Sequence, residues 1–181
     1  MSKEEIEVTA GDQRQKSGRY LTFQLGDESY GITVLKVREI IQMQPITQIP
    51  RTPDYMKGVI NLRGKVIPVA DLRIKFAFEK AEVSERTCII VVSLTMTDGR
   101  ETLTGLIVDA VEEVLQIEAE QIEDAPSFSD TAISTDYIFG MAKVRDNVKM
   151  LIDIDKVVLA ENLEDMAQMA GGEPPEMVVE D

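Results

Sequence analysis

The sequence predicts a mostly β protein made of two copies of one small module of roughly five strands. Short apolar runs alternate with turn signals about every ten residues, which is typical of barrels and sandwiches. Few segments have the period of a helix. Blocks of the first half also reappear in the second half, in the same order. Two small barrels packed together would leave a groove, and grooves between lobes commonly bind helices or small molecules.

The internal repeat rests on two alignments without gaps. GVINLRGKVIPVADL, beginning at Gly58, matches GMAKVRDNVKMLIDI, which begins 82 residues later at Gly140. GITVLKVREIIQM, beginning at Gly31, matches GLIVDAVEEVLQI, which begins 74 residues later at Gly105. Any two β hairpins share an apolar pattern, but here glycine, turn and charged positions coincide as well, which favours a repeat. The matched pairs include Arg63 with Arg145, Asp71 with Asp153, Val37 with Val111 and Glu39 with Glu113.

The N-terminal part begins with a polar stretch, residues 1–18, that has almost no large apolar groups and is expected to form a flexible arm. From Tyr20 to Leu25 two sets of side chains alternate, and Gly26-Asp27 then signals a turn, so a first hairpin is predicted. Residues 34–41 have apolar side chains at helical spacing but are also rich in β-branched residues. A helical turn and a strand resuming at Glu39 both remain open there.

The central hairpin is the clearest element. Its strands run over residues 58–63 and 66–71, separated by Gly64-Lys65, and a Gly-X pair suits a two-residue type II′ turn. That turn would place Arg63 opposite Val66. Asp71 then stands where it can cap a short helical turn from Leu72 to Phe76.

The second half is predicted to begin after a solvated linker, residues 79–86. The strand Cys88 to Met96 comes next, and a further apolar run extends from Leu103 to Ile117. Residues 118–136 are acidic and rich in turn-forming side chains, which indicates a long surface connection.

The C-terminal part is predicted to contain one more hairpin and a helix. The hairpin spans residues 141–152 around Asp146-Asn147, a pair that tolerates the positive φ of a type I′ turn. The helix runs from about Asp155 to Ala170, with Asp155 as its cap and two glycines after its end. The remaining residues, 171–181, form an acidic tail that is expected to be disordered.

The charge balance argues against two classes of partner. Asp and Glu outnumber Lys and Arg by 33 to 19, and the net charge of −14 opposes binding to nucleic acid or to an anionic membrane. The longest strongly apolar run, residues 88–94, is too short to span a bilayer, and the N-terminus lacks an apolar signal segment. A single cysteine excludes an internal disulfide and suits a reducing compartment. We therefore expect a cytoplasmic protein.

Candidate catalytic and metal-binding groups are few. The sequence has no His, which excludes a Ser-His-Asp triad, a Cys-His pair and imidazole metal ligands. Cys88 lies in an apolar strand with no His to activate it, so a buried structural thiol is favoured over a nucleophile. Asp153 and Asp155 have a spacing that suits metal ligands, but a capping role for Asp155 is the simpler interpretation. We expect no catalytic centre, cofactor or metal.

Two alternatives of a different class remain from the residues alone. A small β-barrel enzyme would have to use carboxylates or Cys88, although no pair of nucleophile and base can be named. A nucleic-acid-binding protein is disfavoured further by the acidic composition.

Two charged residues stand out against their surroundings. Glu39 lies among Val37, Ile40 and Ile41, and a charge amid apolar residues must sit at an edge or be paired. Arg63 flanks a turn, where its guanidinium can reach a partner carboxylate, although most turn-flanking Arg side chains are merely solvated.

Four long segments carry a family resemblance: YLTFQLGDESYGITVLKVREI, TPDYMKGVINLRGKVIPVADLRIKF, TGLIVDAVEEVLQI and STDYIFGMAKVRDNVKMLIDIDKV. Together they resemble the CheW family of bacterial chemotaxis coupling proteins, over residues 19–159. The resemblance implies a domain over about residues 19–160, with two intertwined modules at roughly 19–80 and 86–154. It also implies that the modules are SH3-like five-stranded β barrels, without catalytic activity or an obligatory cofactor.

The resemblance further implies an adaptor that bridges the cytoplasmic hairpin tips of chemoreceptors to the regulatory domain of the histidine kinase CheA. In this family the receptor tip docks in the groove between the barrels. The residues that match this surface are Val37, Glu39, Arg63, Cys88, Ile89, Val111 and Val114. CheA is expected to pair end-on with the first module, around Pro53, Tyr55 and Lys57. A paralogue that serves another receptor-kinase system, such as surface or twitching motility, is the close alternative.

Overall fold

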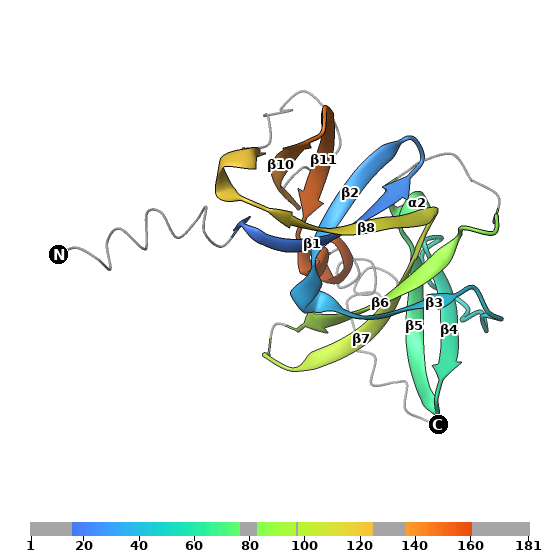
Figure 1. Ribbon diagram of the computed structural model, residues 1–181. Coiled ribbons are helices and arrows are strands. Elements are labelled where there is room, and N and C mark those ends of the chain that lie inside the picture. Colours follow the sequence, from blue (N-terminus) through green and yellow to red (C-terminus); the bar gives the residue numbers. More distant parts are fainter. Residues whose placement is uncertain (1–15, 77–82, 97, 125–136, 161–181) are drawn as a thin grey trace.

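The computed structural model describes residues 16–76, 83–96, 98–124 and 137–160, and Figure 1 shows them arranged mainly as β-strands. The protein is therefore mostly β, as predicted. The strands are β1 (Gly18–Leu25), β2 (Glu28–Thr33), β3 (Val37–Gln42), β4 (Met56–Leu62), β5 (Lys65–Asp71), β6 (Cys88–Thr95), β7 (Glu101–Val108), β8 (Ala110–Ile117), β9 (Ile122–Glu123), β10 (Ile138–Val144) and β11 (Asn147–Ile152). The short helical turns are η1 (Val34–Lys36), α2 (Leu72–Lys75), η2 (Ala119–Gln121) and η3 (Lys156–Ala160).

Two sheets contain all these strands. Sheet A has the strand order β8-β1-β2-β11-β10-β9, and sheet B has the order β3-β6-β7-β5-β4. Each sheet combines strands from both copies of the repeat, because β1 and β2 leave β3–β5 and join the second copy, while β6 and β7 join the first. The exchange is made by parallel pairs that are themselves repeated, Val69 opposite Gly105 in sheet B and Leu151 opposite Gly31 in sheet A.

The repeat extends to the irregularities of the strands. The pairing of β3 skips Arg38 and that of β8 skips Glu112, which are equivalent positions of the two copies. The pairing of β4 skips Lys57 and that of β10 skips Phe139, which are equivalent as well. A bulge re-aims the side chains that follow it. Both copies therefore present their next residues in the same way.

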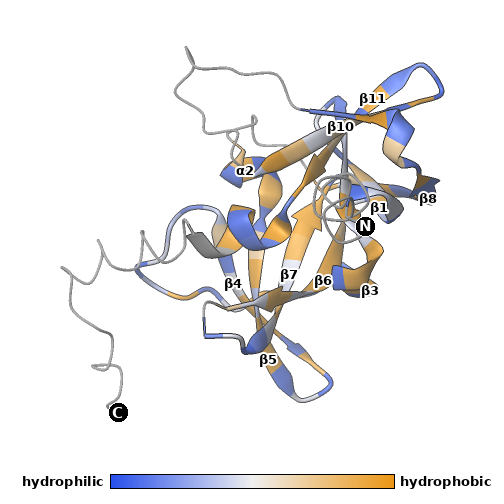
Figure 2. Ribbon diagram, turned by 90° about the vertical axis from the view of Figure 1, so that its left-hand side faces the viewer, coloured by the Kyte–Doolittle hydropathy of each residue, from blue (hydrophilic) through white to orange (hydrophobic). Residues whose placement is uncertain are grey.

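The buried apolar side chains form three clusters. The central core lies between the sheets and includes Leu21 and Phe23 of β1 together with Ile90 and Val92 of β6. Separate clusters fill the other side of sheet A and the other side of sheet B. Because β6 is buried on both faces, its sequence is a continuous apolar run rather than an alternating one. Figure 2 shows this run and its neighbour β7 as largely hydrophobic ribbons.

Both hairpin turns lie one residue before their predicted positions. In the β4–β5 hairpin Leu62 pairs with Lys65, so the turn residues are Arg63 and Gly64, with φ of 51° and 89°. Positive φ at both positions indicates a type I′ turn, and the predicted type II′ turn with Arg63 opposite Val66 is wrong. The physical reason is that Arg63 itself adopts the left-handed conformation, while Asn61 Oδ1 accepts a hydrogen bond from the Gly64 N–H at 2.8 Å.

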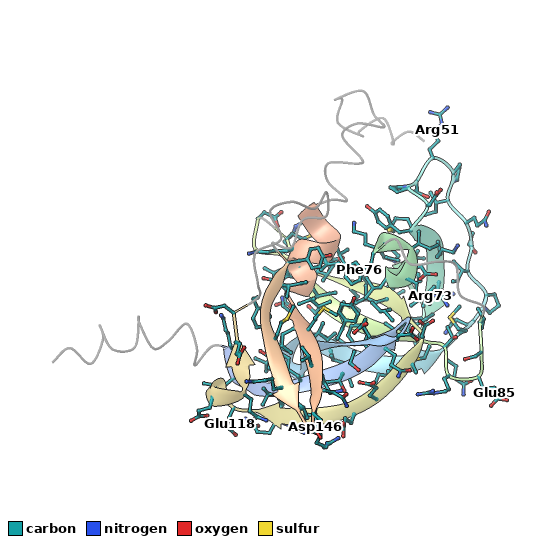
Figure 3. All side chains as sticks on the ribbon, turned by 90° about the horizontal axis from the view of Figure 1, so that it is seen from above. Arg51, Arg73, Phe76, Glu85, Glu118 and Asp146 are labelled. Carbon is teal, nitrogen blue, oxygen red and sulfur yellow. The ribbon has the colours of Figure 1, made fainter. Side chains whose placement is uncertain are left out.

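The second hairpin has the same turn. Val144 pairs with Asn147, so Arg145 and Asp146 form the turn, with φ of 48° and 69°. Figure 3 shows Asp146 at the outer tip of this hairpin. The type of turn is therefore as predicted, but its position is not.

Two aspartates cap the helical turns that follow the hairpins. Asp71 Oδ1 accepts a hydrogen bond from the Arg73 N–H at 2.9 Å, which confirms the predicted cap of α2. At the repeated position Asp153 Oδ1 accepts from the N–H groups of Asp155 and Lys156, at 3.1 and 3.3 Å. The cap is thus Asp153, and the prediction that Asp155 caps this turn is wrong.

Several expectations concern the remaining parts of the chain. Both possibilities left open for residues 34–41 are realised, because η1 precedes β3. The predicted surface connection over residues 118–136 contains η2 and β9 before it leaves the described residues at 124. Of the predicted C-terminal helix the structure describes only the turn η3. Most of the N-terminal arm, part of the 79–86 linker and the 171–181 tail lie outside the described residues. No helix in the described parts is long and apolar enough to cross a membrane.

Candidate protein-binding groove

An ion pair joins the two ends of sheet B. Glu39 lies on β3, the first strand of the sheet, and its carboxylate accepts a hydrogen bond from the guanidinium of Arg63, which lies in the turn beside the last strand. The side chains are 31% and 69% exposed, so the pair is open to solvent and accessible to a partner. The hydrogen bond from Arg63 lowers the pKa of Glu39, so both groups are charged at neutral pH. The two charges predicted for the rim of a site are therefore brought together.

An apolar seam runs beside this pair. Val37 of β3 pairs with Val92, and Val111 of β8 pairs with Phe23. Val92 and Phe23 both belong to the central core, and Val37 and Val111 pack against it. Among the residues that the structure describes, no further strand pairs with the outer edge of β3 or β8, because each is the end strand of its sheet. The margin of the central core therefore reaches the surface along these two strands, and we call this margin the seam.

Cys88 links the two sides of the seam. It stands opposite Gln42 at the end of β3, and on its other side it stands opposite Val108, which ends β7 just before β8 begins. Burial raises the pKa of the thiol, and the backbone of Val111 only partly opposes that shift. The thiol is therefore protonated at neutral pH, and Cys88 acts as a small apolar side chain rather than as a nucleophile.

The predicted receptor-binding residues differ in their accessibility. Val37, Cys88 and Val111 are partly buried at the margin of the central core, and Val114 is 47% exposed on β8. Ile89 is fully buried in the cluster on the other side of sheet B. This residue of β6 therefore packs into that cluster and has no surface to offer a partner.

The residues proposed for kinase binding also lie at different depths. Tyr55 is 8% exposed and belongs to the central core, with the Lys75 ammonium 3.7 Å from the centre of its ring. Pro53 is partly buried in a turn, where its carbonyl accepts a hydrogen bond from the Met56 N–H at 2.9 Å. Lys57 is partly exposed at the bulge of β4. Pro53 and Lys57 are therefore more accessible than Tyr55.

Sequence reasoning left out one residue of the seam. Ile40 pairs with Ile90 of the central core, yet its own side chain is 45% exposed. It is the repeat equivalent of Val114, which pairs with Leu21 of the same core. The offset of 74 residues between the copies therefore gave a signal that could have identified Ile40.

A second ion pair repeats the first. Arg145 donates from Nη1 and Nη2 to the two carboxylate oxygens of Glu113, at 3.1 and 3.2 Å. The side chains are 65% and 36% exposed. The hydrogen bond from Arg145 lowers the pKa of Glu113, as Arg63 does for Glu39.

The candidate metal ligands serve other purposes. Asp155 pairs with Lys36 at 2.8 Å and accepts a hydrogen bond from the Thr95 N–H at 3.0 Å, while Asp153 caps the following turn. Within the described residues no three His, Cys, Asp or Glu side chains are grouped to hold a metal ion.

Comparisons with known proteins agree on one family. The CheW-like domain matches residues 19–161 of the chain. The chain is 40% identical over 144 residues to a chemotaxis protein CheW of Klebsiella aerogenes, covering 80% of this chain and 83% of the relative. It is 30% identical over 151 residues to a chemotaxis protein CheW of Treponema pallidum, covering 82% and 86%. A crystal structure of the scaffolding protein TtCheW from Thermoanaerobacter tengcongensis superposes with a TM-score of 0.70 at 36% identity, covering 81% of this chain and 95% of that one.

Proposed function

This chain belongs to the CheW-like family, and from that premise we propose that it is a non-enzymatic adaptor that couples chemoreceptors to the histidine kinase CheA. The receptor contributes the hairpin tip of its cytoplasmic part, and the kinase contributes its regulatory domain. The adaptor works on the cytoplasmic side of the membrane, where it is recruited to receptor arrays. In the same proposal each sheet corresponds to one SH3-like barrel, and its Glu–Arg pair links the first strand to a hairpin turn at the far side of the sheet.

One observation carries this proposal. The seam exposes aliphatic side chains at the edge of a well-packed core, directly beside a solvent-open ion pair. An amphipathic helix that lies in a groove needs this combination, because its apolar stripe is buried and its flanking charges fix its orientation. Val37, Val111 and Val114 supply the apolar contact, and Glu39 and Arg63 supply the charged rim. Cys88 and Ile89 lie on β6, the strand that pairs with β3, and hold it in place by packing into the buried clusters.

The kinase is proposed to bind elsewhere, at Pro53 and Lys57 near the start of β4. Tyr55 lies between them and holds the local chain in place from the core side. Because receptor and kinase occupy different surfaces, ligand binding to the receptor changes kinase activity only through the relative stability of the assembled states. That difference is a coupling free energy, and it requires no chemistry in the adaptor itself.

The experiment that tests the function is CheA autophosphorylation from ATP, with receptor-containing membranes, in the presence and absence of this protein. We expect a large increase only when all three components are present, and we expect attractant to reverse it. No increase with a demonstrably folded protein would contradict coupling to these partners. It would point instead to a paralogue that serves another receptor-kinase system.

A further inference from the structure

The second Glu–Arg pair stands in the same structural setting as the first. Glu113 follows the bulge of β8 as Glu39 follows the bulge of β3, and both are matched residues of the repeat. Arg145 and Arg63 each occupy the first position of a type I′ turn, with φ of 48° and 51°. Each pair therefore links the first strand of its sheet to the tip of the last long hairpin.

The exposed apolar side chains follow the same pattern. Seven large apolar side chains of the described residues are exposed, and four of them form two matched pairs, Ile40 with Val114 and Val66 with Val148. Their exposed fractions are 45% and 47% in the first pair, and 70% and 50% in the second. Packing within the chain does not explain them, because exposed atoms bury no area on folding. The same positions are thus exposed in both copies, and Ile40 and Val114 each directly follow the glutamate of an ion pair in the sequence.

Ile40 and Val114 lie along one seam. They pair with Ile90 and Leu21, which both belong to the central core. Cys88 stands opposite both Gln42, which ends β3, and Val108, which ends β7 just before β8 begins, so the start of β8 lies near the end of β3. The strands β3 and β8 therefore border the same margin of the core, and each has its own ion pair on its far side.

We infer that Glu113 and Arg145 form the second wall of the docking groove and that Ile40 completes its floor, so that one receptor helix is held between two equivalent walls. This inference rests on the proposed function and names the half of its site that the family resemblance does not include. The floor consists of Val37, Ile40, Val111 and Val114. Each wall offers a guanidinium that donates and a carboxylate that accepts.

The chemistry of the two walls specifies the occupant. Four aliphatic side chains, two on each of the end strands β3 and β8, match one apolar stripe of a helix, with anchors three and four residues apart. A donor and an acceptor on both sides match a helix whose stripe has charged residues of both signs along each edge. An anionic lipid surface or a nucleic acid would need clustered positive charge, whereas each wall is electrically neutral and the chain has a net charge of −14.

The test is a calorimetric titration of each variant with a soluble fragment of the chemoreceptor cytoplasmic hairpin. The variants are Arg63→Glu for the first wall, Arg145→Glu for the second and Lys143→Glu as the control. Lys143 is a fair control because it also forms an exposed pair in the second copy, with Glu123 at 2.6 Å, on the opposite edge of sheet A. We expect about tenfold weaker binding of the fragment for each Arg variant and an unchanged dissociation constant for Lys143→Glu.

Failure of this inference and failure of the proposed function look different. If Arg63→Glu weakens binding but Arg145→Glu binds like the wild type, the second wall is refuted and the function stands. If the folded wild-type protein does not bind the fragment, the proposed function itself is refuted.

A measurement on the wild type covers the case in which Arg145→Glu fails to fold. Backbone amide resonances are followed while the same fragment is added. We expect shifts at residues 37–40 and 63 and also at residues 111–114 and 145. Shifts confined to the first set would overturn the inference.

Discussion

Arg63 and Glu39 form an ion pair that connects strands at opposite ends of the same sheet. The two residues are 24 positions apart in the sequence, and both are solvent-accessible. Because exposed ion pairs contribute little to folding stability, the free energy of unfolding does not explain why this pair is present. The binding role that we propose for it would explain it.

The first prediction concerns this pair. We expect Arg63→Glu and Glu39→Lys to fold with nearly unchanged melting temperatures and to lose about tenfold or more in receptor affinity, because either change leaves two like charges on the rim. The measurements are thermal melting and receptor-dependent activation of CheA. Arg100→Glu is the matched control, since Arg100 forms a similarly exposed pair with Asp98 at 2.8 Å in another turn. Unfolding of Arg63→Glu would show that the pair is structural, and unchanged binding would remove it from the site.

The second prediction compares two matched glycines. A Cβ at Gly58, where φ is +139°, would come within 2.0 Å of the Thr47 carbonyl oxygen, which belongs to the backbone. A Cβ at Gly140 would come within 2.7 Å of a methyl group of Ile122, which can move. We expect Gly58→Ala to destabilise the protein by about 3 kcal/mol, and Gly140→Ala to cost clearly less. Urea unfolding of the two variants measures both values, and equal losses would contradict the argument.

The sequence was sufficient for the repeat, the strand content and most strand positions. These features depend on local patterns such as the alternation from Tyr20 to Leu25 and the apolar run of β6. The hairpin register was missed by one residue, because the identity of Gly64 suggested where positive φ begins, whereas Arg63 adopts it first. Side chains other than glycine adopt that conformation at modest cost when the neighbouring contacts favour it, and the sequence does not contain that information.

The site was predicted only in part for a related reason. Glu39 and Arg63 stand out in the sequence as charges that need a partner, and the family resemblance assigns both to one surface, but their contact requires the strand order β3-β6-β7-β5-β4. That order depends on the exchange of strands between the copies, which no local pattern shows. Ile89 and Tyr55 matched family positions, but their burial could be known only from the packing. Ile40 and Arg145 follow from the repeat once the two ion pairs are seen to be equivalent.

The third prediction concerns a buried charge cluster that joins the sheets. Arg73 donates to Asp71 from Nε at 3.0 Å and from Nη2 at 2.8 Å, and to Asp109 from Nη1 at 3.1 Å. Asp109 also accepts a hydrogen bond at 2.7 Å from the N–H of Gly26, in the turn between β1 and β2. The cluster thus connects α2, which follows strand β5 of sheet B, to the first hairpin of sheet A.

Arg73→Ala would leave the Asp71 carboxylate, whose side chain is 3% exposed, without its counter-charge. We expect a loss of about 3 kcal/mol in the free energy of unfolding, because an unpaired buried charge is strongly unfavourable. Arg73→Lys keeps the charge but not the forked geometry, so an intermediate loss is expected. Chemical denaturation of the three proteins checks this order. A loss below about 1 kcal/mol for Arg73→Ala would mean that water or a neighbouring group replaces the guanidinium.

The fourth prediction concerns alkaline pH. Burial raises the pKa of Tyr20 and of Tyr30 from the ordinary 10.0 to about 12. As the pH rises, the unfolded chain therefore loses these protons before the folded protein does. The stability that the two neutral hydroxyls contribute is complete below pH 10, and it is lost progressively between pH 10 and about pH 12.

The absorbance of tyrosinate during an alkaline titration should accordingly show a component that ionises late, between pH 10 and about pH 12, and this component should be smaller in Tyr30→Phe. Urea unfolding at about pH 8 and about pH 11 should show a loss of stability that is smaller in Tyr30→Phe, because this variant has one fewer buried hydroxyl to ionise. Tyr20→Phe is the less direct comparison, since the Tyr20 hydroxyl also donates a hydrogen bond to the Lys16 carbonyl. If all four tyrosines ionised together near pH 10 while the protein stayed folded, Tyr20 and Tyr30 would have to be accessible to water, and the packing of the central core around Tyr30 would be looser than the structure shows.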